Sequence, residues 1–175
     1  MKHSSLLAGA AIALVLGLSA CGLKKDTRAA EAEVDRFHQH WNAGEFKAVY
    51  DEAHMNFRDA QTADRTIATL ERVKRNYGVF KSTTKRSWGF SSDNGVTDIK
   101  LKYDSAYEHG SAVEAFVYRM TGEKPLLVSY DIMSPETAKK REAEETAARE
   151  AKRKSEDEKR KADREARKEA KKPNG

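Results

Sequence analysis

Apolar side chains recur with two different periods in the middle of the chain. Before Gly78 they fall three or four positions apart, and this spacing predicts three helices at about 27–41, 45–54 and 62–77. After Gly78 the period falls to two, which is typical of strands. In the first helix one apolar stripe is expected to face the core: Ala30, Val34, Phe37 and Trp41. The pattern therefore predicts helices first and a sheet after them.

Four strands are expected in the second part, at 79–90, across Ile99–Tyr107, at 112–120 and at 126–133. Asn94-Gly95 is a strong signal for a hairpin turn. The alternation predicts two inward faces: Ile99, Leu101, Tyr103 and Tyr107, and then Leu126, Val128, Tyr130 and Ile132. Short turns between consecutive strands favour an antiparallel meander with one face on the helices. The predicted fold class is α+β, with three N-terminal helices packed on a four-stranded antiparallel meander.

The last 42 residues contain no large apolar side chain. Ser134-Pro135-Glu136 is a helix start, with a capping serine, proline at the first helical position and an early acid. From Glu136 to Lys172, opposite charges four residues apart outnumber like charges by 13 to 6. These features predict a long, charged, solvent-exposed single helix, and a partly disordered tail is the alternative.

Charge and cysteine content divide the chain further. The formal net charge is +5, but residues 26–133 carry −2 and residues 134–175 carry +4. The near-neutral middle is long enough for one core. Because Cys21 is the only cysteine, no intramolecular disulfide can form.

Residues 1–20 have the parts of a secretory signal: a positive start at Lys2, an apolar run at 6–18, and small residues at its end. Thirteen apolar residues are too few to span a bilayer, which takes about 20. The sequence Leu18-Ser19-Ala20-Cys21 resembles the lipobox of bacterial lipoproteins. The resemblance implies cleavage between Ala20 and Cys21, a diacylglycerol on Cys21 and a further acyl chain such as palmitate on the new terminus. An ordinary signal peptide is the alternative.

A lipidated Cys21 implies a location. Two or more acyl chains give a stable membrane anchor. Gly22 stands where an aspartate would retain a lipoprotein in the inner membrane, so the outer membrane, facing the periplasm, is expected. Outside the cytoplasm no nucleic-acid partner is expected. The basic stretch Lys81–Trp88 is then best interpreted as an edge strand protected by lysines.

A helical layer followed by a curved antiparallel sheet, with Trp41-Asn42-Ala43-Gly44-Glu45-Phe46 between the first two helices, resembles nuclear transport factor two-like and cystatin-like domains. The resemblance covers roughly residues 28–133 and implies a cone-shaped cavity between helices and sheet. Fold alone assigns no function. The expected organisation is a signal peptide at 1–20, a lipidated spacer at 21–27, the domain at 28–133 and the charged tail at 134–175.

Candidate chemistry inside the domain is sparse. Enzymes of the resembling fold place two titratable groups in the cone, and the candidates here are Asp35, His38, Asp51, His54, Asp131 and Tyr118. The histidines lack metal-ligand spacing, and surface or capping roles are expected for them. No catalytic residue, metal or cofactor is assigned. Most aromatic residues are expected in the core, and five are candidates for lining a ligand site: Trp41, Tyr50, Trp88, Tyr103 and Tyr118.

Together these patterns favour a lipid-anchored envelope protein with a small non-catalytic binding or scaffold domain. Its basic arm would reach an anionic polymer such as peptidoglycan, or an envelope protein. A small enzyme that uses acid–base residues in the cone is one alternative, and a spacer lipoprotein without a ligand is another.

Overall fold

A computed structural model describes residues 8–169 of the chain. The first seven residues of the expected signal peptide and residues 170–175 lie outside this range. The chain divides into two units between Met133 and Ser134.

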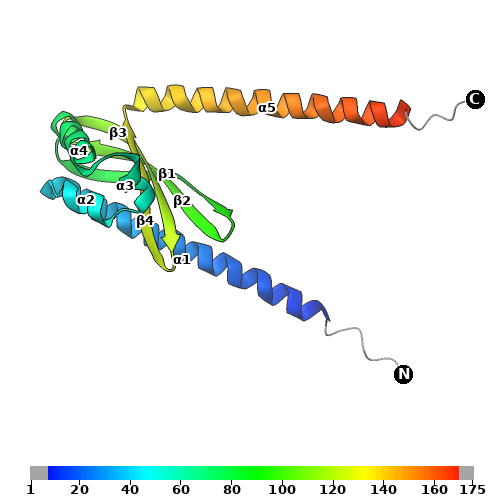
Figure 1. Ribbon diagram of the computed structural model, residues 1–175, viewed down its shortest axis with the longest axis horizontal. Helices are drawn as coiled ribbons and strands as arrows, with labels where there is room; N and C mark the ends of the chain where they lie inside the picture. Colours follow the sequence, from blue (N-terminus) through cyan, green and yellow to red (C-terminus); the bar gives the residue numbers. More distant parts are fainter. Residues whose placement is uncertain (1–7, 170–175) are drawn as a thin grey trace, which may run out of the picture. The chain divides into compact units, whose positions relative to one another are not determined.

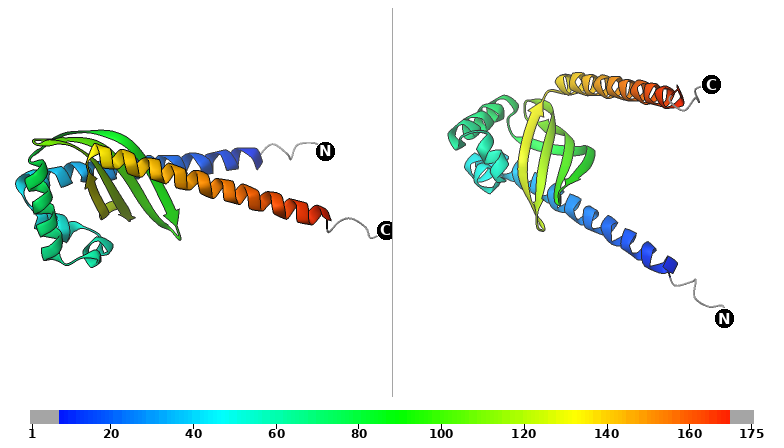
Figure 2. Two further views of the ribbon diagram at one scale, coloured as in Figure 1. Left: turned by 90° about the horizontal axis from the view of Figure 1, so that it is seen from above. Right: turned by 45° about the vertical axis from the view of Figure 1, so that its right-hand side comes forward.

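The described residues form five helices and four strands (Figure 1). Their bounds are α1 Ala8–Ala43, α2 Phe46–Glu52, α3 Met55–Ala60, α4 Ala63–Tyr77, β1 Phe80–Asp93, β2 Val96–Tyr107, β3 Gly110–Thr121, β4 Lys124–Met133 and α5 Pro135–Glu169. Helices α1 to α4 pack on the antiparallel sheet, so the predicted α+β class is confirmed (Figure 2). Among the described residues, no helix combines the length and the apolar character that crossing a bilayer requires.

The helical layer differs from the expectation in two places. Helix α1 begins at Ala8 and includes Cys21, and a fourth short helix, α3, follows α2. The sequence period missed α3 because it has no buried residue. Its first turn is instead held by His54, whose Nδ1 accepts a hydrogen bond from the Asn56 amide at 3.1 Å. His54 is therefore a capping histidine, one of the two roles expected for it.

The four strands form one sheet in the order β1-β2-β3-β4, as expected for a meander. Asn94 and Gly95 link β1 to β2 with positive φ angles of 49° and 79°, the conformation that a two-residue type I′ turn requires. The predicted hairpin is thus confirmed. In β2 the four residues predicted to face inward are all buried: Ile99, Leu101, Tyr103 and Tyr107.

Bulges change the faces of the two outer strands. β4 contains one extra residue opposite Val117 and Tyr118 of β3. As a result Leu127 pairs with Tyr118 and is buried, whereas Leu126 is only partly buried. The predicted inward face of the fourth strand is therefore wrong at its first half. Two further register shifts occur in β1, none of whose residues is buried.

The core lies between α1 and the sheet. The predicted stripe of α1 is confirmed, since Ala30 and Trp41 are 0% exposed and Val34 and Phe37 at most 4%. Trp41 donates from Nε1 to the carbonyl of Gly78 at 3.0 Å, and the Asn42 amide exchanges two hydrogen bonds with the backbone of Phe80. The Trp-Asn-Ala-Gly turn thus fastens the end of α1 to the start of β1.

The second unit is the predicted charged helix, α5. Its N-terminus is capped as expected, because Ser134 Oγ accepts from the Thr137 amide at 3.2 Å. Lys152 and Glu156, which carry opposite charges and lie four residues apart, meet at 3.9 Å.

Candidate functional site

A buried carboxylate in β3 is the most unusual chemical group of the domain. Glu114 follows Ala112 on the inward face of β3, where Phe116 and Tyr118 come next, and it is 0% exposed. The register places it opposite Tyr103 of β2 and Ile132 of β4. Taking a carboxylate out of water is costly unless it is paired and hydrogen-bonded. Its partners therefore decide what it does.

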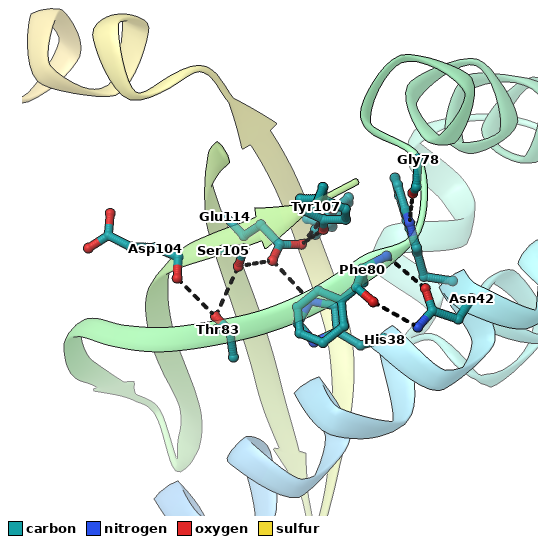
Figure 3. A network of polar contacts seen from close by, with 11 residues as sticks. His38, Asn42, Gly78, Phe80, Thr83, Asp104, Ser105, Tyr107 and Glu114 are labelled. Carbon is teal, nitrogen blue, oxygen red and sulfur yellow. Dashed lines mark hydrogen bonds and ion pairs between the residues drawn. The ribbon is translucent and has the colours of Figure 1, made fainter. Parts of the chain in front are cut away.

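Four side chains from three elements meet at Glu114. The Nε2 atom of His38, on α1, is hydrogen-bonded to Glu114 Oε2 at 2.9 Å, and the Ser105 hydroxyl also donates to Oε2 (Figure 3). Two tyrosine hydroxyls, of Tyr107 and Tyr130, donate to Oε1 at 2.8 Å each. Each carboxylate oxygen thus accepts two hydrogen bonds. We call these five residues the Glu114 cluster.

The hydrogen bonds favour the ionised form of Glu114. Burial acts to raise the pKa of the carboxyl, but the hydrogen bond and attraction of His38, together with the hydrogen bonds of Ser105 and Tyr107, outweigh it and hold the pKa below its ordinary value. Burial, together with the nearby negative charge of Glu114, raises the pKa values of Tyr107 and Tyr130 far above that of a free tyrosine. The two hydroxyls therefore act as donors to a carboxylate.

Aromatic rings close the cluster to solvent. The His38 ring stacks on Phe80 with centroids 3.7 Å apart (Figure 3). It also lies edge-on to Phe37 and Phe116. His38 is 3% exposed, and its Nδ1 is buried without a hydrogen-bond partner among the described residues. Because neither His38 nor Glu114 can be reached from outside, the geometry fits a polar lock between α1 and the sheet rather than a reacting pair.

An open pocket lies between α3, α4 and β4. Its volume is about 360 Å³, within the usual range of ligand sites. Most of its lining is apolar: Phe57, Leu70, Val73, Val128, Tyr130 and Ile132. Polar atoms come from neighbours such as Thr66, Ser129 and Asp131. We call this space the α4–β4 pocket.

Tyr130 links the pocket to the Glu114 cluster. Its ring lines the pocket, while its hydroxyl points into the core and donates to Glu114. The member of the Glu114 cluster that borders the pocket is thus Tyr130, whose phenol is protonated and hydrogen-bonded to Glu114. This arrangement offers apolar contact to a ligand through the ring of Tyr130.

The five aromatic candidates from the sequence are dispersed. Trp41, Tyr103 and Tyr118 lie in the core, and Trp88 is 52% exposed. Tyr50 donates its hydroxyl to the Arg58 carbonyl at 3.0 Å and holds α3. None of the five is among the described residues that line the α4–β4 pocket. Tyr118 borders a space of only about 40 Å³, enough for about one water.

The acid–base candidates also separate. Of the six, only His38 belongs to the Glu114 cluster, and its partner Glu114 was not a candidate. Asp51 pairs with Lys47 on the surface, Asp35 is exposed, and Asp131 lines the pocket. Within the described residues, no three histidine, cysteine or acidic side chains are placed to hold a metal. The sequence did contain a signal for Glu114: it is a charged residue at an inward position of a strand, β3, whose successive side chains point to opposite faces of the sheet.

Comparison with known protein families and with curated proteins finds no match to this chain.

Proposed function

We propose that the chain is a lipid-anchored protein of the cell envelope, held in the outer membrane and facing the periplasm. Its domain at 28–133 is a small non-catalytic binding module, and its charged helix is an arm toward an anionic polymer or an envelope protein. Each part of this proposal rests on a different observation.

The position of the lipobox-like sequence relative to the core supports the proposed lipid anchor. Leu18-Ser19-Ala20-Cys21 lies on α1, and the first described side chain that packs against the core is Leu23. Cleavage between Ala20 and Cys21 would therefore leave every described core residue in the mature chain. Thioether-linked acyl chains at Cys21 would attach the domain through the helix that forms its centre.

The α4–β4 pocket supports binding without catalysis. It is half-open and mostly apolar, and its size suits a small apolar or amphiphilic molecule. Tyr130 lines the pocket, but its hydroxyl points into the core and donates to Glu114. A ligand would therefore be held by apolar contacts and oriented by the few polar groups at the rim.

The charge of the second unit supports the arm. Helix α5 is exposed along most of its described length, and residues 134–175 carry a net charge of +4. An excess of Lys and Arg on a soluble helix attracts anionic surfaces in a salt-dependent way. Peptidoglycan, which has free carboxylates, is the polymer that an outer-membrane lipoprotein would meet.

A cavity enzyme is the second candidate, because His38 and Glu114 do converge. Turnover by this pair would require the ring packing over His38 to open. Histidine carbethoxylation followed by peptide mass spectrometry tests this, with the exposed His109 as internal control. We expect His109 to react and His38 to stay unmodified in the folded protein. Rapid modification of His38 would favour the enzyme.

Fatty-acid labelling in cells tests the anchor. We expect incorporation of labelled palmitate in the wild type and none in Cys21→Ser. The matched control is Gly22→Ala, because a Cβ at Gly22 meets no atom within 4 Å. Labelling that persists in Cys21→Ser, or that is absent from the wild type, contradicts the proposal.

A fluorescent apolar probe such as anilinonaphthalene sulfonate tests the pocket. Thr69 lines the pocket from α4 and is exposed, so Thr69→Trp should fill the space and reduce probe binding. Ala68 is the adjacent exposed residue and does not line the pocket, so Ala68→Trp should leave probe binding unchanged. Equal binding by both variants would show that the probe binds elsewhere.

Sedimentation with purified peptidoglycan tests the arm. We expect the full chain to co-sediment at low salt, and the bound fraction to fall as salt rises. Deletion of residues 134–175 should abolish binding and leave the domain folded. Retention of the shortened chain would place the contact in the domain instead.

A further inference from the structure

The β1–β2 hairpin exposes large apolar side chains near its turn. Trp88 and Phe90 are each 52% exposed, and Val96 beside the turn is 41% exposed. Trp88 pairs with Leu101 and Phe90 with Ile99, so both aromatic rings lie on the face that is buried in β2. Leu101 and Ile99 are at most 1% exposed, whereas the two rings next to them are about half exposed. We call Trp88 and Phe90 the hairpin patch.

The hairpin patch lies at the end of the sheet from which Cys21 emerges. In a meander, the β1–β2 turn and the β3–β4 turn lie at the same end. Lys25 of α1 forms an ion pair with Glu123 in the β3–β4 turn. Cys21 is four residues earlier, about 6 Å along the helix axis. Figure 1 shows the β1–β2 turn and the N-terminal half of α1 directed the same way.

A second ion pair sets the distance along α1. Glu31 of α1 meets Lys85 of β1 at 2.6 Å. From this pair, Phe90 lies five residues along β1 toward the turn, roughly 16 Å. Cys21 lies ten residues back along α1, about 15 Å. The aromatic rings and the anchor residue therefore advance by similar amounts toward the same end.

We propose that the hairpin patch contacts the bilayer surface beside the acylated Cys21. This inference rests on the proposed lipid anchor and adds a second membrane contact to it. Tryptophan is enriched at membrane–water interfaces, where an apolar ring with a polar edge is favoured. The acyl chains would supply the affinity, and the patch would fix the orientation of the domain above the membrane.

The surrounding charges predict the character of this contact. Lys100 and Lys124 lie toward this end together with Asp93 and Glu123, so the two signs are mixed. Contact through apolar rings should therefore persist in high salt and on zwitterionic lipid. This behaviour separates it from the salt-sensitive binding expected of the arm.

The two tryptophans of the chain provide the test. Trp41 is 0% exposed and is bound to Gly78 at the opposite end of β1, whereas Trp88 belongs to the patch. The lipidated mature protein, which begins at Cys21, is placed in phosphatidylcholine vesicles with and without bromine on the lipid acyl chains. We expect bromine to quench part of the emission in the wild type and none in Trp88→Phe, in which Trp41 is the remaining reporter.

Two further variants locate the contact. Phe90→Ser keeps Trp88 and should reduce its quenching, whereas Met55→Ser removes an equally exposed apolar side chain on α3 and should not. Quenching should be the same at low and high salt. Absence of quenching in a protein that carries labelled palmitate overturns the membrane contact and leaves the anchor intact. A Trp88 blue shift that depends on protein concentration, without quenching, would assign the patch to a second copy of the chain instead.

Discussion

Replacing Glu114 by glutamine should destabilise the domain strongly. The substitution preserves shape but turns one acceptor oxygen into an NH₂ group, so donors among His38, Ser105, Tyr107 and Tyr130 lose their partner. Breaking a buried charged pair on one side costs about 3–5 kcal/mol. That is a large share of a typical domain stability of about 5–15 kcal/mol.

The loss should depend on pH in a defined direction. The pKa of Glu114 in the folded protein lies below its ordinary value of 4.5. A depressed folded pKa adds stability that is fully present above the unfolded pKa and disappears as pH falls through the folded pKa. The difference in unfolding free energy between wild type and Glu114→Gln should thus be constant near neutral pH. It should shrink below about pH 4.5.

Urea unfolding across a pH series measures this difference. Asp51→Asn is the matched control, because its i,i+4 surface pair with Lys47 is worth only about 0.3–0.5 kcal/mol. If Glu114→Gln does not fold, Tyr130→Phe removes one donor and should cost about 1.5–3 kcal/mol. A loss below 1 kcal/mol for Glu114→Gln, or one that does not change with pH, would refute the polar lock.

Three further predictions concern packing, backbone and arm. Trp41→Ala should cost about 3–5 kcal/mol in chemical denaturation, since the ring is fully buried; a loss under 1 kcal/mol would contradict that burial. Gly78→Ala should destabilise more than Gly95→Ala although both φ angles are near 78°, because a Cβ at Gly78 would lie 2.7 Å from the Glu108 Cβ; equal losses would contradict the close approach. A peptide of residues 135–172 should show helical circular dichroism at neutral pH that falls in acid and partly in high salt; a random-coil spectrum would contradict the ion-paired helix.

Local periodicity predicted the elements whose faces are set by one strong alternation. The α1 stripe and the β2 face repeat without interruption, and each has one buried side. The prediction of the inward face of β4 was wrong because a bulge depends on how two strands pair, which the sequence of one strand does not show. Helix α3 was missed because capping by His54, not burial, holds it.

The candidate site was harder to predict because burial is decided by distant segments. Trp41 and Trp88 are the same residue type, yet one is 0% and the other 52% exposed. The difference arises because α1 packs over the sheet near Trp41 and leaves the hairpin end uncovered. The Glu114 cluster combines residues up to 92 positions apart, from His38 to Tyr130, so no local spacing could have revealed it.

Intact-mass spectrometry of the protein isolated from membranes shows whether Cys21 carries a lipid anchor. We expect a mature chain that begins at Cys21 and carries the added mass of a diacylglyceryl group, with or without a further acyl chain. A chain that retains residues 1–20, or that has an unmodified Cys21, would contradict it.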